Sequence, residues 1–140
     1  MPAVFESTKI KFLYPDNWKV QPRSEDENLD GVTLELPSGG FFSLEREVEG
    51  QLEEELIEEV ADSFAQDYGE IEREEIELEG GGARERVVDF RFYYLDLVVV
   101  SRLVILEVDG VNYVVQFQAE SRDFDSNAMV FSAIMKQIRG

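Results

Sequence analysis

The feature of the sequence that most restricts its fold is a pair of long apolar segments separated only by Asp109-Gly110. An Asp-Gly pair between two extended segments is the strongest short-range signal of a β-hairpin with a two-residue turn. It predicts antiparallel strands over 97–108 and 111–120. The first of these strands is apolar on both faces, and a strand buried on both sides needs a covering layer on each side of its sheet. The sequence therefore predicts a sheet that is covered on both faces.

Two amphipathic helices are predicted to provide the covering layers. The segments 51–70 and 123–140 each carry apolar residues at the spacing of one helix face. In the second segment, Asp123, Asp125 and Ser126 are candidates for the N-terminal cap or the acidic first turn. The apolar faces consist of Leu52, Leu56, Val60, Phe64 and Tyr68 in the first helix, and of Phe124, Ala128, Phe131, Met135 and Ile138 in the second.

Further periodic segments, bounded by turn-forming residues, predict the remaining strands. They are 8–15, 18–20, 32–37, 40–48, 70–80 and 84–94. The polar segment 21–31 contains Pro and Gly and is predicted to be an exposed loop. The chain, residues 1–140, is thus predicted to be a single α+β domain. In this domain an antiparallel sheet of about six to seven strands is sandwiched between helices.

The charge of the chain restricts its partners. The net charge is −18, from 31 acidic and 13 basic residues. Phosphate backbones and anionic membrane surfaces repel a chain of this charge, so we expect no nucleic-acid partner. The chain has no Cys and no His, and therefore lacks the commonest general base and the commonest transition-metal ligand. These features argue against an enzyme and favour a cationic partner.

The sequence also indicates a compartment. Residues 1–12 lack the basic segment followed by an apolar segment that defines a signal peptide. The longest apolar run, 97–108, is too short to span a bilayer and contains Arg102. We therefore expect a cytoplasmic protein without membrane insertion.

The acidic residues of the first predicted helix have two interpretations. Most of them lie outside the apolar stripe, which favours a solvated helix face. The alternative is a low-affinity divalent-cation-binding protein that uses the acidic region 45–79, where sixteen acidic residues accompany only Arg46 and Arg73. The candidate metal ligands are Glu54, Glu55, Glu58, Glu59 and Asp62.

Arg102 lies within the most apolar strand, where an unpaired charge would be costly. Asp89 on the preceding strand would face it if Leu95-Asp96 forms a two-residue turn, whereas a longer turn would shift the pairing. The favoured interpretation is a structural ion pair, or an arginine whose charged end reaches the margin of the sheet. An anion-binding role is the alternative.

Other polar and aromatic residues are candidates for recognition. Asn112, Gln116 and Gln118 alternate with the core residues of the last strand, so they form a polar recognition face or border a covering helix. Aromatic residues in strands belong to the core more often than to a ligand groove. This applies to Trp18, Tyr93, Tyr94 and Tyr113.

No motif predicts a catalytic residue or a cofactor site. Residues 123–127 begin like a calcium loop, but Ala128 stands where the turn glycine is needed and Ile134 where the closing Glu is needed. Gly80-Gly81-Gly82 precedes a strand rather than a helix, so it lacks the setting of a phosphate-binding loop. We therefore expect neither a cofactor nor catalysis.

Three segments carry a family resemblance: FLYPDNWKV (12–20), VSRLVILEVDGVNYVVQFQAE (100–120) and FDSNAMVFSAIMKQI (124–138). With the order of the predicted elements, they resemble the PsbP-like superfamily. That superfamily includes PsbP of photosystem II, DcrB-like proteins, Ran-binding import factors and Eag chaperones. The resemblance covers nearly the whole chain and implies an α/β/α sandwich with a non-enzymatic binding role. It does not choose a partner, because members of one fold bind unrelated molecules.

These features together predict a non-catalytic protein-binding module that acts as an adaptor or in a chaperone-like way. Its partner is an unidentified protein, and electrostatics favour a basic surface on that partner. This interpretation predicts an exposed apolar or aromatic patch on the folded chain.

Overall fold

The computed structural model describes residues 2–7, 9–22, 31–47, 52–82 and 84–140. In chain order the elements are β1 (Ala3–Glu6), β2 (Lys11–Tyr14), β3 (Lys19–Val20), β4 (Val32–Glu35), β5 (Phe41–Arg46), α1 (Glu53–Tyr68), β6 (Ile71–Ile76), β7 (Arg86–Tyr94), β8 (Leu97–Val108), β9 (Val111–Glu120), α2 (Ser121–Ser126) and α3 (Ala128–Arg139). Most of the predicted loop 21–31 lies outside the described residues. No helix within the described ranges is long and apolar enough to cross a membrane.

Seven strands form one antiparallel sheet in the order β3-β4-β5-β9-β8-β7-β6. The β8–β9 hairpin closes at Asp109 and Gly110, whose φ values of 50° and 80° are those of a two-residue turn with positive φ at both positions. The predicted α+β fold with an antiparallel sheet of six to seven strands is confirmed.

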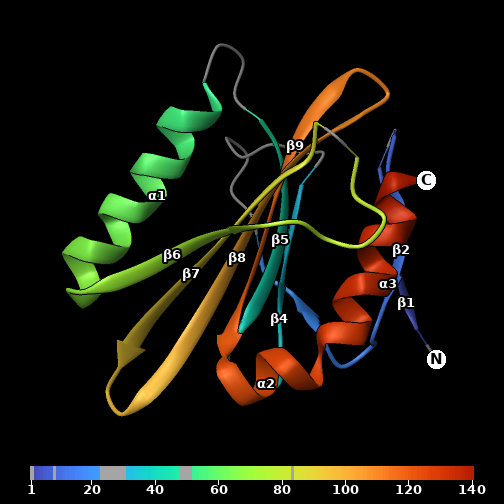
Figure 1. Cartoon of the computed structure of the whole chain (residues 1–140). Coiled ribbons are helices and arrows are strands. Elements are labelled where there is room, and N and C mark those ends of the chain that lie inside the picture. Colours follow the sequence, from blue (N-terminus) through green and yellow to red (C-terminus); the bar gives the residue numbers. More distant parts are fainter. Residues whose placement is uncertain (1, 8, 23–30, 48–51, 83) are drawn as a thin grey trace.

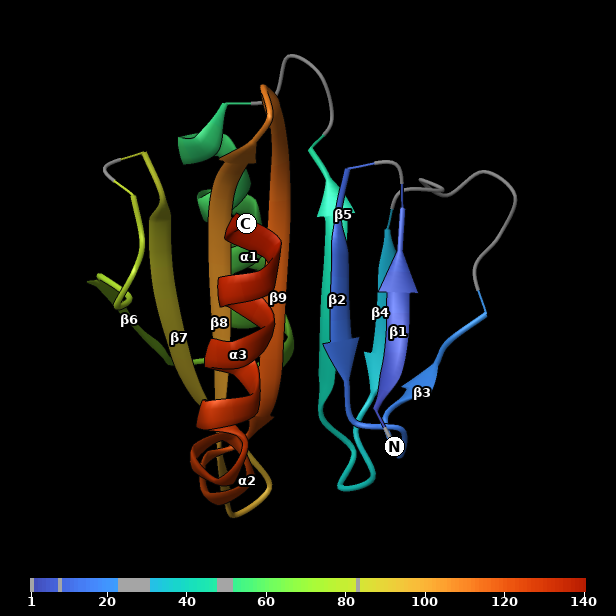
Figure 2. The same cartoon turned by 90° about the vertical axis from the view of Figure 1, so that its right-hand side faces the viewer.

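One face of the sheet is covered by α2, α3 and the β1–β2 hairpin, and Figure 2 shows α3 and the hairpin side by side over it. The larger core lies between these layers. In this core Phe117 of β9 stacks on Phe124 of α2 and Phe131 of α3, with ring centroids 4.8 and 5.1 Å apart. Phe12 of the hairpin meets Phe42 of β5 edge-on at 5.7 Å. The covering layer on this face is therefore part helix and part hairpin.

The strand predicted in 8–15 is present as β2, whereas β1 was not predicted. The segment 8–15 contributes only β2, which pairs with β1 and not with the main sheet. The alternation in β2 buries Phe12 and Tyr14 and exposes Lys11 and Leu13. A strand with one buried face can lie flat over another layer, so this hairpin covers the sheet instead of extending it.

The other face of the sheet is covered by α1, which contacts β6 and β7 (Figure 1). Ile57 and Ala61 of α1 form a smaller core there with side chains of β7 and β8. Within β8, Val104 belongs to the larger core and Leu103 to the smaller one. The prediction that this strand needs cover on both faces is confirmed.

The C-terminal segment is two helices and not the single predicted one. Asn127 separates them with φ −101° and ψ 8°, and its side-chain amide donates a 2.9 Å hydrogen bond to the carbonyl of Asp123. A short polar side chain that bonds to the backbone in this way competes with helix continuation. Asp123 lies in the acidic first turn of α2, as one of the two predicted roles requires. The N-cap itself is Glu120, whose side chain accepts hydrogen bonds from the amides of Arg122 and Asp123.

Glu120 makes the stability of α2 depend on pH. Partial burial opposes its ionisation, but hydrogen bonds from the Arg122 side chain and from the two amides outweigh burial, so the pKa of Glu120 lies below its usual range. A lowered pKa gives stability that is complete above the pKa in the unfolded chain. That stability is lost as the pH falls through the lower pKa of the folded chain. We therefore expect Glu120→Ala to lower the urea unfolding midpoint at neutral pH and to lower it less as the pH approaches the folded-state pKa.

The matched control for Glu120→Ala is Asp125→Ala, which removes an exposed carboxylate from the same helix. We expect this control to leave the midpoint nearly unchanged at each pH. A Glu120→Ala deficit that stays constant from neutral to acidic pH would contradict the capping role, because the lost contribution would then not depend on ionisation.

Candidate partner-binding surface

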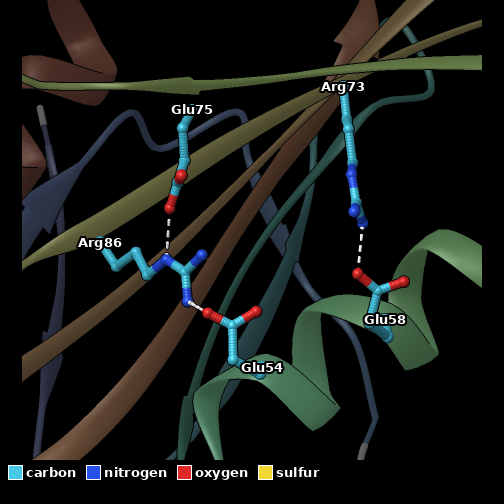
Figure 3. A network of polar contacts seen from close by, with 5 residues as sticks. All are labelled: Glu54, Glu58, Arg73, Glu75 and Arg86. Atoms are coloured by element: carbon cyan, nitrogen blue, oxygen red, sulfur yellow. Dashed lines mark hydrogen bonds and ion pairs between the residues drawn. The ribbon is translucent and has the colours of Figure 1, made fainter.

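Besides its apolar contacts, the acidic helix α1 forms ion pairs with arginines of the sheet (Figure 3). Arg86 of β7 contacts Glu75 of β6 and Glu54 of α1. Arg73 Nη1 of β6 lies 2.8 Å from Glu58 Oε1 of α1. Two of the five candidate metal ligands, Glu54 and Glu58, therefore face cationic side chains of the sheet. Both glutamates remain exposed, with side-chain exposures of 70% and 53%, so these ion pairs lie on the solvated face of α1 that the sequence indicates.

The other three candidates, Glu55, Glu59 and Asp62, are exposed as well. Within the residues that the structure describes, no group of three or more Asp, Glu, His or Cys side chains is arranged to hold a metal ion. Arginines outside the region 45–79 also reduce its charge, since Arg86 contacts Glu54 and Glu75, and Arg91 contacts Glu74 at 3.4 Å. No observation on the described residues favours the cation-binding alternative.

The structure pairs Arg102 with Asp89. The two-residue turn at Leu95-Asp96 places Asp89 of β7 opposite Arg102 of β8. Arg102 Nε and Nη2 donate hydrogen bonds of 2.8 and 2.9 Å to the two carboxylate oxygens. The guanidinium also lies 5.0 Å from the ring centroid of Phe124 and 5.5 Å from that of Phe131. Because the two-pronged contact and the rings enclose the charge, the pair belongs to the core between the sheet and the C-terminal helices.

The three polar candidates of β9 do not form one site. Gln116 Nε2 donates a 3.0 Å hydrogen bond to Ser101 Oγ of β8. Gln116 also lines a groove of about 300 Å³ between α1 and the β5–β9 part of the sheet. Gln118 lies further along the same face, opposite Phe41 of β5. Asn112 lines a different hollow, which contains Glu53 and Arg86.

Asn112 has a structural explanation at the end of β5. The amide of Glu47 donates a 2.9 Å hydrogen bond to the Asn112 carbonyl. Burial and the nearby Glu53 carboxylate raise the pKa of Glu47, while a hydrogen bond with the Asn112 side chain lowers it in part. Asn112 therefore supports the backbone and the carboxylate of its neighbour, and the recognition role predicted for it stays a prediction.

Four exposed large side chains lie together at the tip of the β7–β8 hairpin, whereas other exposed apolar residues, such as Met129 of α3, are scattered over the surface. Tyr93 is 69% exposed, Tyr94 53% and Leu95 81%, and Leu97 is exposed as well. Figure 1 shows this tip extending beyond β6 and α1 at the lower left. We call these four residues the hairpin tip. Tyr94 meets Tyr68 of α1 at 5.9 Å, whereas Tyr93 points to the other face of the sheet, so the tip exposes aromatic surface on both faces. An exposed aromatic and apolar feature of this kind is what the binding interpretation predicts.

Leu95 is also in an unfavourable backbone conformation. Its φ of 56° places it in the left-handed region, which Gly, Asn or Asp normally occupies in a two-residue turn. For other residues the left-handed conformation costs roughly 1–2 kcal/mol. A leucine at this position thus costs folding free energy while 81% of its surface stays exposed.

A hollow of about 550 Å³ lies next to the hairpin tip. Tyr93 and Val98 provide aromatic and aliphatic surface, and Glu70 and Glu72 lie along its border. Arg91 also lines the hollow, and its charge is directed in part to Glu74. The hollow therefore combines an apolar surface with an acidic border, which is an arrangement suited to a cationic partner.

Residue type alone predicts a core position for four aromatic residues, and for two of them this prediction is wrong. Trp18 and Tyr113 are buried in the larger core, as predicted, whereas Tyr93 and Tyr94 are exposed. Position in the hairpin provides the missing signal. Both tyrosines come directly before the predicted turn at Leu95-Asp96, and the end of a hairpin can extend beyond the helices that cover its middle.

The fold is similar to that of solved structures, among them the following two. One is PsbP from the cyanobacterium Synechocystis (CyanoP), with a TM-score of 0.65, 12% identity, and coverage of 97% of this chain and 90% of that one. The other is a protein of unknown function from Pseudomonas aeruginosa, suggested to be a regulator, with a TM-score of 0.50, 13% identity, and coverage of 96% and 93%. No protein-family model and no curated protein matches the sequence. The structural similarity shows a PsbP-like fold. Because the sequence identities are low, function has to be argued from this chain's own surface.

Proposed function

We propose that this chain is a non-catalytic accessory protein that binds a partner protein through the hairpin tip. The observation that carries the proposal is the concentration of exposed large side chains at one turn, with Tyr93, Tyr94 and Leu95 as its centre. Tyrosine is enriched among the residues that contribute most to binding free energy in protein interfaces. A tip of this shape would insert its side chains into a concave, apolar part of the partner.

The conformation of Leu95 supports a binding role over a folding role. A strained and exposed residue lowers the stability of the free protein, and such residues concentrate at functional sites. If stability alone determined this position, Asn or Gly would satisfy the turn better. Burial of Leu95 in an interface would supply the hydrophobic contribution that the free protein lacks.

The charge around the tip indicates the character of the partner. Asp96 in the turn and the nearby Glu70 and Glu72 are exposed, and the chain as a whole carries a net charge of −18. An acidic border around an apolar centre favours a partner with basic residues around an apolar depression. The cytoplasmic location of this complex stays a prediction.

Replacement of Leu95 by Asn separates folding from binding. We expect Leu95→Asn to raise the free energy of unfolding by on the order of 1 kcal/mol, because Asn tolerates the left-handed conformation. We also expect it to reduce capture of the partner in a crosslinked pull-down from native lysate, because the apolar side chain is lost. Urea unfolding and quantification of the captured protein measure the two effects.

The matched control is Val20→Ser, which changes an exposed apolar residue in β3, at the opposite edge of the sheet. This control should leave capture unchanged. If Leu95→Asn captures as much partner as the unmodified protein, the hairpin tip is not the binding surface. The pull-down at low and high salt then characterises the contact, since capture that weakens with salt indicates a basic partner.

A further inference from the structure

We infer that the outer edge of β6 accepts an added β-strand from an extended, cationic segment of the partner. This inference rests on the proposed function and names the chemistry of the segment that the partner presents. It would place the segment beside the hollow at the hairpin tip.

The first observation is that β6 is an open edge. It is the last strand of the seven-stranded sheet and pairs only with β7, and Figure 2 shows it at the outer margin of the molecule. Among the described residues, no backbone hydrogen bond beyond the β6–β7 ladder involves residues 71–76. An edge strand presents a row of backbone donors and acceptors to which another strand can pair. The opposite edge strand, β3, has only two residues and therefore presents far fewer backbone donors and acceptors.

The second observation is the charge of this edge. Residues 70–79 contain six glutamates and one arginine. Arg73 contacts Glu58, Glu75 contacts Arg86, and Glu74 contacts Arg91 at 3.4 Å. No ion pair from the described part of the chain reaches Glu70, Glu72 or Glu77. The edge therefore keeps a surplus of negative charge.

This charge selects the kind of strand that can pair. A second copy of β6 would bring like charges opposite one another, which destabilises strand pairing. A neutral apolar strand would leave the glutamates without partners. A strand with Lys or Arg at alternate positions would form cross-strand ion pairs. The acidic residues thus block self-association and admit a cationic segment.

The third observation is the hollow at the tip. Glu72 lies opposite Arg91, and Tyr93 lies two residues further along β7 on the same face of the sheet. An added strand would lie roughly 4.8 Å beyond β6, with alternate side chains directed to that face. Such a side chain lies within reach of the hollow formed by Tyr93 and Val98. The expected segment therefore has one large apolar residue among its basic residues.

Direct titration with a synthetic peptide tests this inference. The probe is a fluorescein-labelled peptide of about ten residues in which Lys alternates with Val and one Val is replaced by Leu. It is titrated against the intact protein by fluorescence anisotropy at low salt, and amide hydrogen exchange is measured with and without the peptide. We expect binding together with roughly tenfold slower exchange in residues 71–76. We expect no binding of analogues that are N-methylated at alternate amides or carry Glu in place of Lys.

Two charge-reversal variants give a matched comparison on the protein side. Glu70→Lys with Glu72→Lys changes the edge, whereas Glu55→Lys with Asp62→Lys makes the same change of charge at exposed positions of α1. We expect the first variant to weaken peptide binding roughly tenfold, and the second to weaken it much less.

The outcomes separate this inference from the proposed function. Absence of peptide binding overturns strand addition. Binding that leaves amide exchange in 71–76 unchanged also overturns it, and so does an equal loss of peptide affinity in the two charge-reversal variants. The hairpin-tip proposal survives these results if Leu95→Asn still reduces partner capture. Conversely, unchanged capture by Leu95→Asn overturns the hairpin-tip proposal, even if the peptide protects β6.

Discussion

Replacing Asp89 with Ala is expected to destabilise the protein by about 3–5 kcal/mol, because it leaves a charged arginine without its partner in the core. Asp89 is 2% exposed, and both of its oxygens accept hydrogen bonds from Arg102. The guanidinium lies close to the rings of Phe124 and Phe131, so water has little access to replace the lost carboxylate. Urea unfolding followed by tryptophan fluorescence measures the loss, since Trp18 lies in the same core.

The control is a double variant, Asp89→Leu with Arg102→Met, which replaces the ion pair with apolar side chains. Such replacements are often neutral or stabilising, so we expect the double variant to recover most of the loss. Recovery would show that the single variant is unstable because of the unpaired charge and not because of altered strand pairing. A loss below about 1 kcal/mol for Asp89→Ala would instead place Arg102 in contact with water.

Replacing Phe117 with Ala should cost about 3–5 kcal/mol through the cavity that it creates. Phe117 has no exposed surface, and its ring stacks on Trp18, Phe124 and Phe131 with centroids 6.3, 4.8 and 5.1 Å away. The loss of this one ring therefore weakens contacts to Trp18, which precedes β3, and to α2 and α3. Chemical unfolding of the variant measures the change.

Two comparisons make the Phe117 result specific. Phe117→Leu keeps most of the volume and should cost clearly less than Phe117→Ala. Tyr93→Ala removes an aromatic ring of similar size from the exposed hairpin tip and should change stability by less than about 0.5 kcal/mol. Equal losses for Phe117→Ala and Tyr93→Ala would contradict the assignment of one ring to the core and the other to the surface.

The sheet and its two covered faces could be predicted because the signals were local. Asp109-Gly110 defines the β8–β9 turn, and the two apolar faces of 97–108 require cover on both sides. The pairing of Asp89 with Arg102 was predicted on the condition that Leu95-Asp96 forms a two-residue turn, and the structure has that turn. In each case the geometry of two residues determines the register of a whole hairpin.

The parts that could not be predicted depend on tertiary contacts or on one side chain. β1 is stabilised by its pairing with β2, and β2 in turn lies on the sheet through Phe12 and Phe42. The break at Asn127 depends on one hydrogen bond of its amide, while the apolar period continues through the break from Phe124 to Phe131. Periodicity alone therefore predicts one continuous helix there.

The candidate site was only partly visible in the sequence. Gln116 lines a groove, as a recognition residue would, but residue type places Tyr93 and Tyr94 in the core, where most strand aromatics lie. The contact between Arg86 and Glu54 joins residues 32 positions apart. No local sequence pattern shows such a contact, so the ion pairs between α1 and the sheet become visible only in the folded chain.

The measurement that tests the central claim most directly is site-specific photocrosslinking from the hairpin tip. A photoreactive phenylalanine analogue replaces Tyr93 in one sample and Val20, at the opposite edge of the sheet, in another. We expect one partner protein to crosslink at position 93 and not at position 20, through a peptide of the partner that contains Lys or Arg. No crosslinked partner at position 93, or the same proteins at both positions, would contradict the claim that the tip of the β7–β8 hairpin is the binding surface.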